Sequence, residues 1–191
     1  MLIGLTGAAF SGKDTTGRYL HKHHQFFSKA FADPLRDGLR IMFGLTDWHF
    51  LPEHKEEKIE WIGKSPRKLL QSLGTEWGRD QVARNLWVRH MARRVQPILN
   101  GGGDVVITDV RFLDEAELIH RFGGQIWRVI RKEGQKTKHA DHTSEQESKR
   151  IIADVDIENF GTLEQLYERI DEALRFEIEH GETHERRRIG L

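Results

Sequence analysis

The stretch from Gly7 to Thr15, GAAFSGKDT, has the residue types and the spacing of a loop that binds phosphate. Gly7 and Gly12 allow phosphate oxygens to approach the backbone closely, and successive N–H groups of such a loop point inward. Lys13 follows the second glycine, where its side chain would reach the β- and γ-phosphates of a nucleoside triphosphate. The stretch therefore predicts a nucleotide site in which Lys13 is a catalytic cation.

The residue after this lysine, Asp14, departs from the usual pattern. A Ser or Thr commonly stands there, and its hydroxyl binds Mg²⁺. A carboxylate is also a hard oxygen ligand, which could hold the ion directly or through water. Thr15 offers a hydroxyl, but it lies about 100° further round a helix and cannot simply substitute. We expect Asp14 and Thr15 to be metal ligands whose geometry the sequence leaves open.

Three more side chains that suit phosphate chemistry follow apolar runs. Asp109 ends the run VVIT and is expected to hold Mg²⁺ or its water shell. Arg111 could bind a phosphate by a two-pronged contact, and the alternative is a salt bridge to Asp114 or another local acid. Arg131 opens a basic run, which is either a solvated loop or a lid that closes on the triphosphate. We expect Arg111 and Arg131 to be catalytic, by stabilising charge on the transferring phosphoryl group.

In the segment from Lys64 to Arg79, KSPRKLLQSLGTEWGR, the polar residues Arg67, Gln71 and Arg79 interrupt a predicted helix and turn. Gln71 follows Arg67 by four residues, so both can share one helical face. Guanidinium groups suit an acceptor phosphate, and an amide can read a base edge by paired hydrogen bonds. Trp77 could stack on a base or fill the core, and taken alone it favours the core.

The elements that must position these residues alternate between strands and helices. Short apolar runs predict strands at residues 2–6, 26–31, 104–108, 125–130 and 155–158. Apolar spacing, capping residues and glycine stops predict helices at residues 13–20, 35–43, 65–74, 80–95, 114–122 and 162–178. Residues 181–191 are expected to be a solvated end.

This alternation predicts an α/β sandwich with a mostly parallel sheet. Ligands of such sheets lie at the carboxyl ends of the strands. The loop at residues 7–15 and the side chains Asp33, Asp109, Arg111 and Arg131 all follow predicted strand ends. We therefore expect them to converge in one crevice.

Composition narrows the class of protein further. The chain has 191 residues, which suits a single domain, and its 30 basic and 30 acidic residues give a formal net charge of zero. This balance argues against a dedicated nucleic-acid binder. Cysteine is absent, no apolar run reaches membrane-spanning length, and the first predicted strand leaves no room for a signal peptide. We expect a protein of the cytoplasm that does not bind membranes.

Together the motifs form a recognisable set, which runs in order along nearly the whole chain. They are GLTGAAFSGKDT (4–15), KAFADPLR (29–36), LLQSLGTEWGR (69–79), VVITDVRFLDEAE (105–117), HTSE (142–145) and IENFGTLEQL (157–166). The chain resembles the phage-type deoxynucleoside monophosphate kinases, a branch of the P-loop nucleoside monophosphate kinases. The third and fourth motifs make the resemblance more specific than the first, which alone indicates only a P-loop NTPase.

The resemblance implies a three-layer P-loop sandwich of about five parallel strands in one domain. Its core would comprise residues 1–32, 97–130 and 150–180, with an acceptor-binding helical insertion at 33–96 and a lid at 131–149. The implied reaction transfers the γ-phosphoryl of ATP, with Mg²⁺, to a deoxynucleoside monophosphate. It needs little proton chemistry, because the acceptor phosphate is largely dianionic at neutral pH.

The resemblance also implies roles for residues at matching positions. The ATP-binding candidates are Gly7, Ser11, Gly12, Lys13, Asp14, Thr15, Thr16 and Asn159, the last of these near the adenine. The acceptor-site candidates are Asp33, Arg36, Arg67, Gln71, Thr75, Arg79 and Arg111. Asn85-Leu86-Trp87 stands where such chains are expected to carry an acidic residue, which leaves any acceptor role there open.

Two other functions remain open at this point. A hydroxyl-acceptor kinase such as a dephospho-coenzyme A kinase has a similar N-terminus, and Asp33 would be its natural base. A regulatory protein could instead hold ATP without transferring phosphate. We expect the protein to bind small nucleotides and to bind neither nucleic acid nor membranes. Its assembly is left open, and a homodimer is one alternative. The sequence does not indicate which base the acceptor carries. The resemblance also suggests a viral origin, in which case the protein would act in the cytoplasm of the host cell.

Overall fold

The computed structural model describes residues 1–131 and 147–189, with side chains through residue 179. The chain divides into two compact units. The first unit combines Met1–Ser28 with Gly103–Leu191, and the second is the continuous segment Lys29–Gly102. The predicted insertion at residues 33–96 falls within the second unit. Residues 132–146 of the predicted lid lie outside the described residues.

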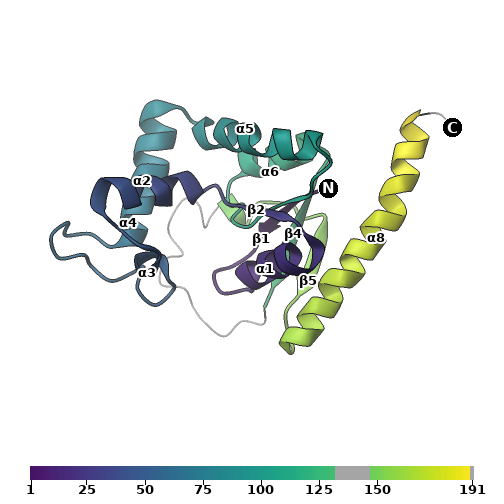
Figure 1. The fold of residues 1–191 in the computed structure, drawn as a ribbon, viewed down its shortest axis with the longest axis horizontal. Coiled ribbons are helices and arrows are strands. Elements are labelled where there is room, and N and C mark those ends of the chain that lie inside the picture. Colours follow the sequence, from purple (N-terminus) through teal and green to yellow (C-terminus); the bar gives the residue numbers. More distant parts are fainter. Residues whose placement is uncertain (132–146, 190–191) are drawn as a thin grey trace. The chain divides into compact units, whose positions relative to one another are not determined.

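A five-stranded sheet forms the centre of the first unit (Figure 1). The strand order is β2-β3-β1-β4-β5, and β1 pairs in parallel with both β3 and β4, as β4 does with β5. The strands are β1 (Leu2–Thr6), β2 (Phe27–Lys29), β3 (Val105–Ile107), β4 (Gln125–Ile130) and β5 (Val155–Glu158). All five predicted strands are present, and only the second and third are shorter than expected.

The central position of β1 explains its composition. Every residue of β1 is buried, because neighbouring strands flank it and helices cover both faces. Leu2 lies opposite Val105 of β3, and Ile3 lies opposite Gln125 of β4. The strand therefore ends at Thr6 in the middle of the sheet, and the predicted phosphate loop begins at the next residue.

Side chains of β1 alternate between two layers of helices. Ile3 and Leu5 join the core beneath α1 (Lys13–His24) and α8 (Leu163–Ile189). On the other face, a Cβ at Gly4 would lie 2.2 Å from the Ile119 side chain of α6 (Leu113–Arg121), so α6 packs directly on the strand. The first core also contains Leu20, Phe26, Val106, Trp127, Val129, Ile157, Leu166, Ile170 and Leu174.

Helix α8 is longer than its packing surface. Leu166, Ile170 and Leu174 are buried, whereas Phe176 and Ile178 are 58% and 56% exposed. The helix nevertheless continues to Ile189, beyond the end at residue 178 that was predicted for it (Figure 1). None of the described helices combines the length and the apolar character needed to cross a membrane.

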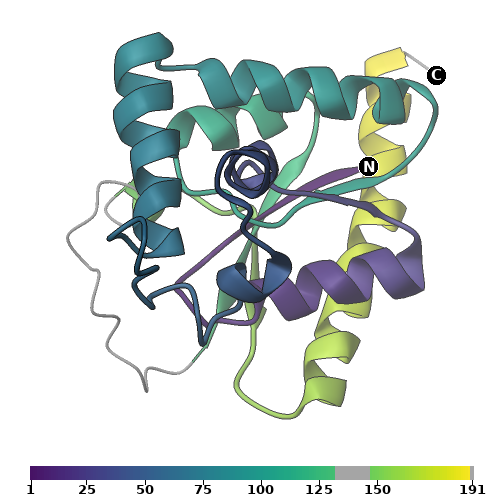
Figure 2. The same cartoon turned by 60° about the vertical axis from the view of Figure 1, so that its left-hand side comes forward.

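The second unit is helical (Figure 2). Its core contains Leu39, Leu45 and Leu69, with Phe43, Phe50, Ile59, Ile62, Leu70 and Leu73 packed around them. The Ser65 hydroxyl accepts a hydrogen bond from the Lys68 N–H, which is the predicted cap of α4. The elements are α2 (Asp33–Phe43), α3 (Asp47–Phe50), α4 (Pro66–Gln71), the π-helix η1 (Ser72–Val82) and α5 (Leu86–Asn100).

Two helix boundaries predicted in this unit are wrong. Gly74 does not end the helix, which runs on as η1 through Val82, and the next helix begins at Leu86 rather than Asp80. The reason is Trp87, whose indole N–H donates to the Gly74 carbonyl at 2.7 Å. A Cβ at Gly78 would lie 2.5 Å from the Trp87 ring, so this indole occupies the space beside η1. Trp77 is 46% exposed, and its expected place in the core is also wrong.

Candidate active site

The loop between β1 and α1 is shaped by glycines in backbone conformations that other residues rarely adopt. Gly7 has φ +135° and Gly12 has φ +113°. A Cβ at Gly7 would lie 2.4 Å from the Val129 carbonyl oxygen, and one at Gly12 would lie 2.5 Å from the Asn159 Nδ2. Both positions therefore require glycine for space as well as for conformation. The loop thus packs closely against the end of β4 and against Asn159.

Two cations contact the backbone of this loop. The Lys13 ammonium donates to the carbonyl oxygens of Gly7 and Ala8 at 2.7 and 2.6 Å. The Arg131 guanidinium donates to the carbonyl of Phe10 at 3.4 Å. The structure thus brings two of the three predicted catalytic cations, Lys13 and Arg131, to the loop, although 118 residues separate them in the sequence.

Three hydroxyl groups around the loop are buried without a partner. Thr6 at the end of β1, Ser11 in the loop and Thr16 in α1 are at most 2% exposed. No described residue makes a hydrogen bond to any of the three hydroxyl oxygens. Because buried polar groups are normally satisfied, a bound ligand or water is expected here. The predicted metal ligands on α1 are more open, since Asp14 is exposed and Thr15 is half-buried.

The end of β3 lies close to the start of α1. A Cβ at Gly17 would be 2.5 Å from the Thr108 side chain, so the helix packs closely on this strand end. Asp109 is the next residue and is half-buried. The third predicted metal ligand therefore follows a strand end that α1 directly contacts.

Arg111 is exposed, and its backbone is fixed by a carboxylate that the sequence reading missed. Glu115 is only 3% exposed, and its Oε2 accepts the N–H groups of Arg111 and Phe112 at 2.8 and 3.1 Å. This is the reciprocal half of a capping box at the start of α6. The sequence signal that could have indicated this contact is a Glu three residues after the cap position of the helix.

Asn159 directly follows β5, the last strand along the chain, and contacts the phosphate loop. Its amide Nδ2 donates to the Ser11 carbonyl at 2.8 Å, and its backbone N–H donates to the Ile130 carbonyl. The contact joins residues 148 apart, and no local pattern could have indicated it. A role for Asn159 beside the adenine stays a prediction.

The acceptor-site candidates in the second unit differ in their surroundings. Arg67 pairs with Glu56 at 3.2 Å, and the Arg79 guanidinium, 9% exposed, donates to the Arg84 carbonyl at 3.2 Å. Gln71 and Thr75 are half-buried along α4 and η1. Asp33 and Arg36 belong to one side-chain cluster at the start of α2, where Arg36 Nη1 lies 3.3 Å from Asp33 Oδ1.

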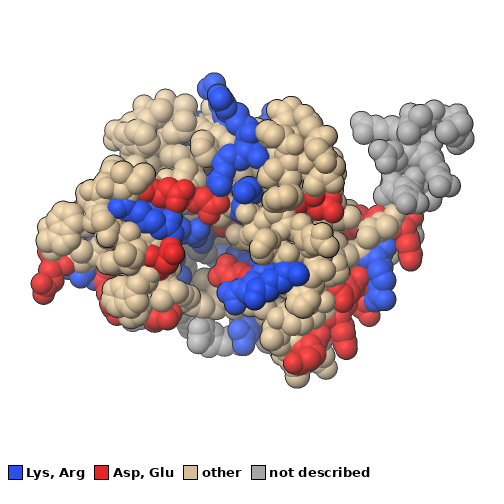
Figure 3. Space-filling view, in the orientation of Figure 1, with Lys and Arg blue, Asp and Glu red and all other residues tan. Residues whose placement is uncertain are grey.

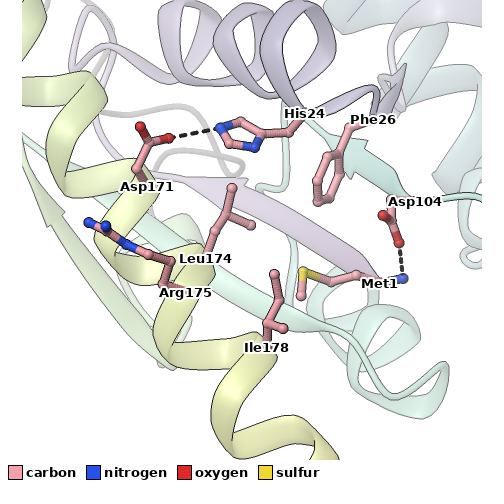
Figure 4. Close-up of a pocket in the computed structure, with 8 residues that line it drawn as sticks. All are labelled: Met1, His24, Phe26, Asp104, Asp171, Leu174, Arg175 and Ile178. Atoms are coloured by element: carbon pink, nitrogen blue, oxygen red, sulfur yellow. Dashed lines mark hydrogen bonds and ion pairs between the residues drawn. The ribbon is translucent and has the colours of Figure 1, made fainter.

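A cavity of about 520 Å³ lies elsewhere in the first unit (Figure 4). Met1 and Asp104 line it from the residues just before β1 and β3, and the hydrogen-bonded His24 and Asp171 line it from α1 and α8. It is therefore at the amino ends of the strands, where α/β sheets do not usually bind nucleotides. No predicted site residue lines it. We assign the nucleotide site to the loop at the carboxyl end of β1.

Charged side chains are mixed on the face shown in Figure 3. Basic and acidic groups are both present there. This mixture matches the formal net charge of zero.

Comparison with known proteins gives a consistent result. The family model described as deoxynucleotide monophosphate kinase matches residues 52–170. A relative in Acanthamoeba polyphaga mimivirus, whose name assigns this activity provisionally, is 32% identical and covers 89% of this chain and 94% of its own. The deoxynucleotide monophosphate kinase of Enterobacteria phage T4 is 24% identical, over 91% of this chain and 98% of its own.

A solved structure supports the architecture. The dephospho-CoA kinase of Campylobacter jejuni superposes with a TM-score of 0.53 at 13% identity, covering 95% of this chain and 98% of its own. At this identity the likeness concerns the fold alone. The predicted P-loop sandwich, with five strands and helices on both faces, is confirmed by the sheet and by this superposition.

Proposed function

The chain belongs to the deoxynucleotide monophosphate kinase family, and we propose that it transfers the γ-phosphoryl group of ATP to the phosphate of a deoxynucleoside monophosphate. The observation that supports the donor half is the glycine loop, where Gly7 and Gly12 adopt positive φ angles and pack so closely against Val129 and Asn159 that a Cβ would not fit. The family match supports the acceptor half. We also propose that the reaction takes place in the cytoplasm, or in that of a host cell if the chain is viral.

The residues at the loop fit a magnesium complex of ATP. The carboxylates of Asp14 and Asp109 and the hydroxyl of Thr15 are hard oxygen donors of the kind that Mg²⁺ prefers. Ser11 and Thr16 add buried hydroxyls that lack a partner in the described residues. When bound, the ion would neutralise charge on the β- and γ-phosphates.

The chain's own residues then act mainly by position and charge. The acceptor phosphate loses its second proton near a pKa of about 6, so it can attack without a general base. The Lys13 ammonium and the loop N–H groups would hold the donor phosphates, and Arg111 and Arg131 would stabilise charge on the transferring group. Each of these four contributions is electrostatic.

The contacts of Asp33 favour a phosphate acceptor over a hydroxyl acceptor. A hydroxyl-acceptor kinase benefits from a free carboxylate as base. Asp33 Oδ2 instead accepts the Ala30 N–H at 2.9 Å and two Arg94 nitrogens, while Oδ1 accepts from Arg36. A carboxylate that already pairs with two guanidinium groups is suited to holding those groups in place rather than to accepting a proton from a hydroxyl acceptor.

The test is ADP production from Mg-ATP with separate deoxynucleoside monophosphates, ribonucleoside monophosphates and dephospho-coenzyme A. We expect ADP only with one or more deoxynucleotides, matched by an equal amount of the diphosphate product. Turnover with dephospho-coenzyme A alone would show a hydroxyl-acceptor kinase. ATP binding without turnover of any acceptor would show a regulatory protein.

Lys13→Ala should remove most of this turnover. Loss of one preorganised charge at a transferring phosphoryl group typically lowers kcat by about 10²–10³-fold. Lys22→Ala, on the same helix and exposed, is the matched control and should keep wild-type kcat. Near wild-type kcat in Lys13→Ala would contradict the assignment of the loop.

A further inference from the structure

One carboxylate in the second unit joins two guanidinium groups from different helices. Asp33 lies at the start of α2, and Arg36 follows it by one turn. Arg94 comes from α5, 61 residues along the chain, and both its terminal nitrogens lie 3.3 Å from Asp33 Oδ2. The Ala30 N–H holds the same oxygen at 2.9 Å. The cluster therefore ties α5 to the first turn of α2.

The charge of this cluster suits an anion. Two guanidinium groups and one carboxylate leave one net positive charge. Asp33, Arg36 and Arg94 keep 30%, 34% and 29% of their side chains exposed, so an anion can reach them. Each guanidinium has five N–H donors, of which Asp33 occupies at most two. The remaining donors have the planar fork that phosphate oxygens accept.

We propose that Arg94 is a positioning residue of the acceptor-phosphate site. It holds the Asp33 carboxylate, and Asp33 in turn holds the Arg36 guanidinium in the orientation that binds the acceptor phosphate. This inference rests on the proposed function and adds a residue from α5 to its acceptor site. Sequence patterns did not single out Arg94, because its partner Asp33 is remote in the chain.

The neighbours of Arg94 on α5 do not share this role. Arg93 is exposed and points about 100° away round the helix. His90 lies one turn earlier; although its surface is exposed, partial desolvation and then the charges of Arg94 and Arg93 lower its pKa below the ordinary 6.5. His90 is therefore neutral at pH 7.5, and the positive charge of the cluster comes from the two arginines.

The experiment compares Arg94→Ala, Arg94→Lys and the control Arg93→Ala in the full chain, with the best acceptor from the panel above. We expect Arg94→Ala to raise the KM for the acceptor by about tenfold or more, because a two-pronged charged contact is lost. The KM for ATP should stay within about twofold, since the donor residues are elsewhere. Arg94→Lys keeps a charge but not the fork, and should raise the acceptor KM by an intermediate factor.

A double-mutant cycle separates positioning from direct contact. If Arg94 acts through Asp33, Arg94→Ala should change the acceptor KM by less than about twofold in an Asp33→Asn background. If the two substitutions instead raise the acceptor KM by independent factors that multiply in the double variant, the positioning role is overturned. Circular dichroism and thermal unfolding check that each variant folds. If Arg94→Ala does not fold, Arg94→Lys replaces it in the same measurements.

The possible failures are distinguishable. A wild-type acceptor KM in Arg94→Ala, or in Arg94→Lys if only that variant folds, overturns the inference while the wild type remains a deoxynucleotide kinase. An equal rise in the KM for ATP and acceptor also overturns it, because that shows a general loss of structure. A wild type that turns over no deoxynucleotide overturns the proposed function and the inference together.

Discussion

At the scale of single residues, the phosphate loop depends on positions that tolerate no side chain. Gly12 combines a φ of +113° with direct contact to the Asn159 amide, which itself donates to the Ser11 carbonyl. A substitution there would strain the backbone and displace the amide. The neighbouring N–H groups would then lose the inward orientation on which phosphate binding depends.

Gly12→Ala should therefore weaken ATP binding by about tenfold or more, because the new Cβ would lie 2.5 Å from the Asn159 Nδ2. Gly123→Ala is a matched control for strain, since Gly123 has φ +71° with no atom within 4 Å of its Cβ position. Calorimetric titration with ATP measures the two dissociation constants. Equal affinities in the two variants would contradict the importance of this contact.

Residues that are close in sequence could be proposed for the candidate site without a structure. Lys13 and Asp14 were proposed because a single loop sets their spacing. The contacts of Arg94 with Asp33 and of Asn159 with Ser11 could not be identified in this way. They join residues 61 and 148 positions apart, and such pairs depend on how whole elements pack.

At the scale of elements, the strands were more predictable than the helices of the second unit. The bounds of β1, β4 and β5 agree with those predicted, and β1 was the clearest because a strand covered on both faces contains few polar residues. The π-helix η1 could not be predicted, since Trp87 stabilises it from outside the segment. Tertiary packing there overrides the preference of Gly74 to end a helix.

Helix α5 should make stability depend on pH through His90. Its pKa in the folded chain lies below the ordinary 6.5, first because partial desolvation of this otherwise exposed side chain disfavours the charged imidazole and then because Arg94 and Arg93 repel it. Between the folded pKa and 6.5 the unfolded chain binds more protons, so the free energy of unfolding decreases as pH falls through that window.

His90→Gln should show a smaller decrease, because it has no imidazole to protonate. Urea unfolding at pH 7.5 and pH 5.5 measures the difference for each protein. The same decrease in wild type and variant would show that His90 does not contribute to this dependence.

At the scale of the whole molecule, the expected donor and acceptor residues divide between the two compact units. The ATP candidates all belong to the first unit, and the acceptor candidates except Arg111 belong to the second. Each ligand should therefore stabilise mainly the unit that holds its residues, because binding stabilises the conformation that it contacts.

Amide hydrogen exchange can test this division. A non-hydrolysable ATP analogue should slow exchange at residues 7–16, and the acceptor nucleotide alone should slow exchange at residues 33–42 and 86–98. The chain without ligand provides the reference rates. Protection of both regions by either ligand alone would show that the division does not hold.

The central place of β1 also affects how the chain can fold during synthesis. Leu2 pairs with Val105, and Ile3 pairs with Gln125, so β1 has no sheet partner until these later segments have left the ribosome. At about 5–20 residues per second, the first of these pairings must wait roughly 5–20 s. The continuous segment Lys29–Gly102 emerges within that interval and can form its own contacts first. The apolar β1 has meanwhile no sheet to cover it, and truncation before Val105 should therefore yield a chain that aggregates.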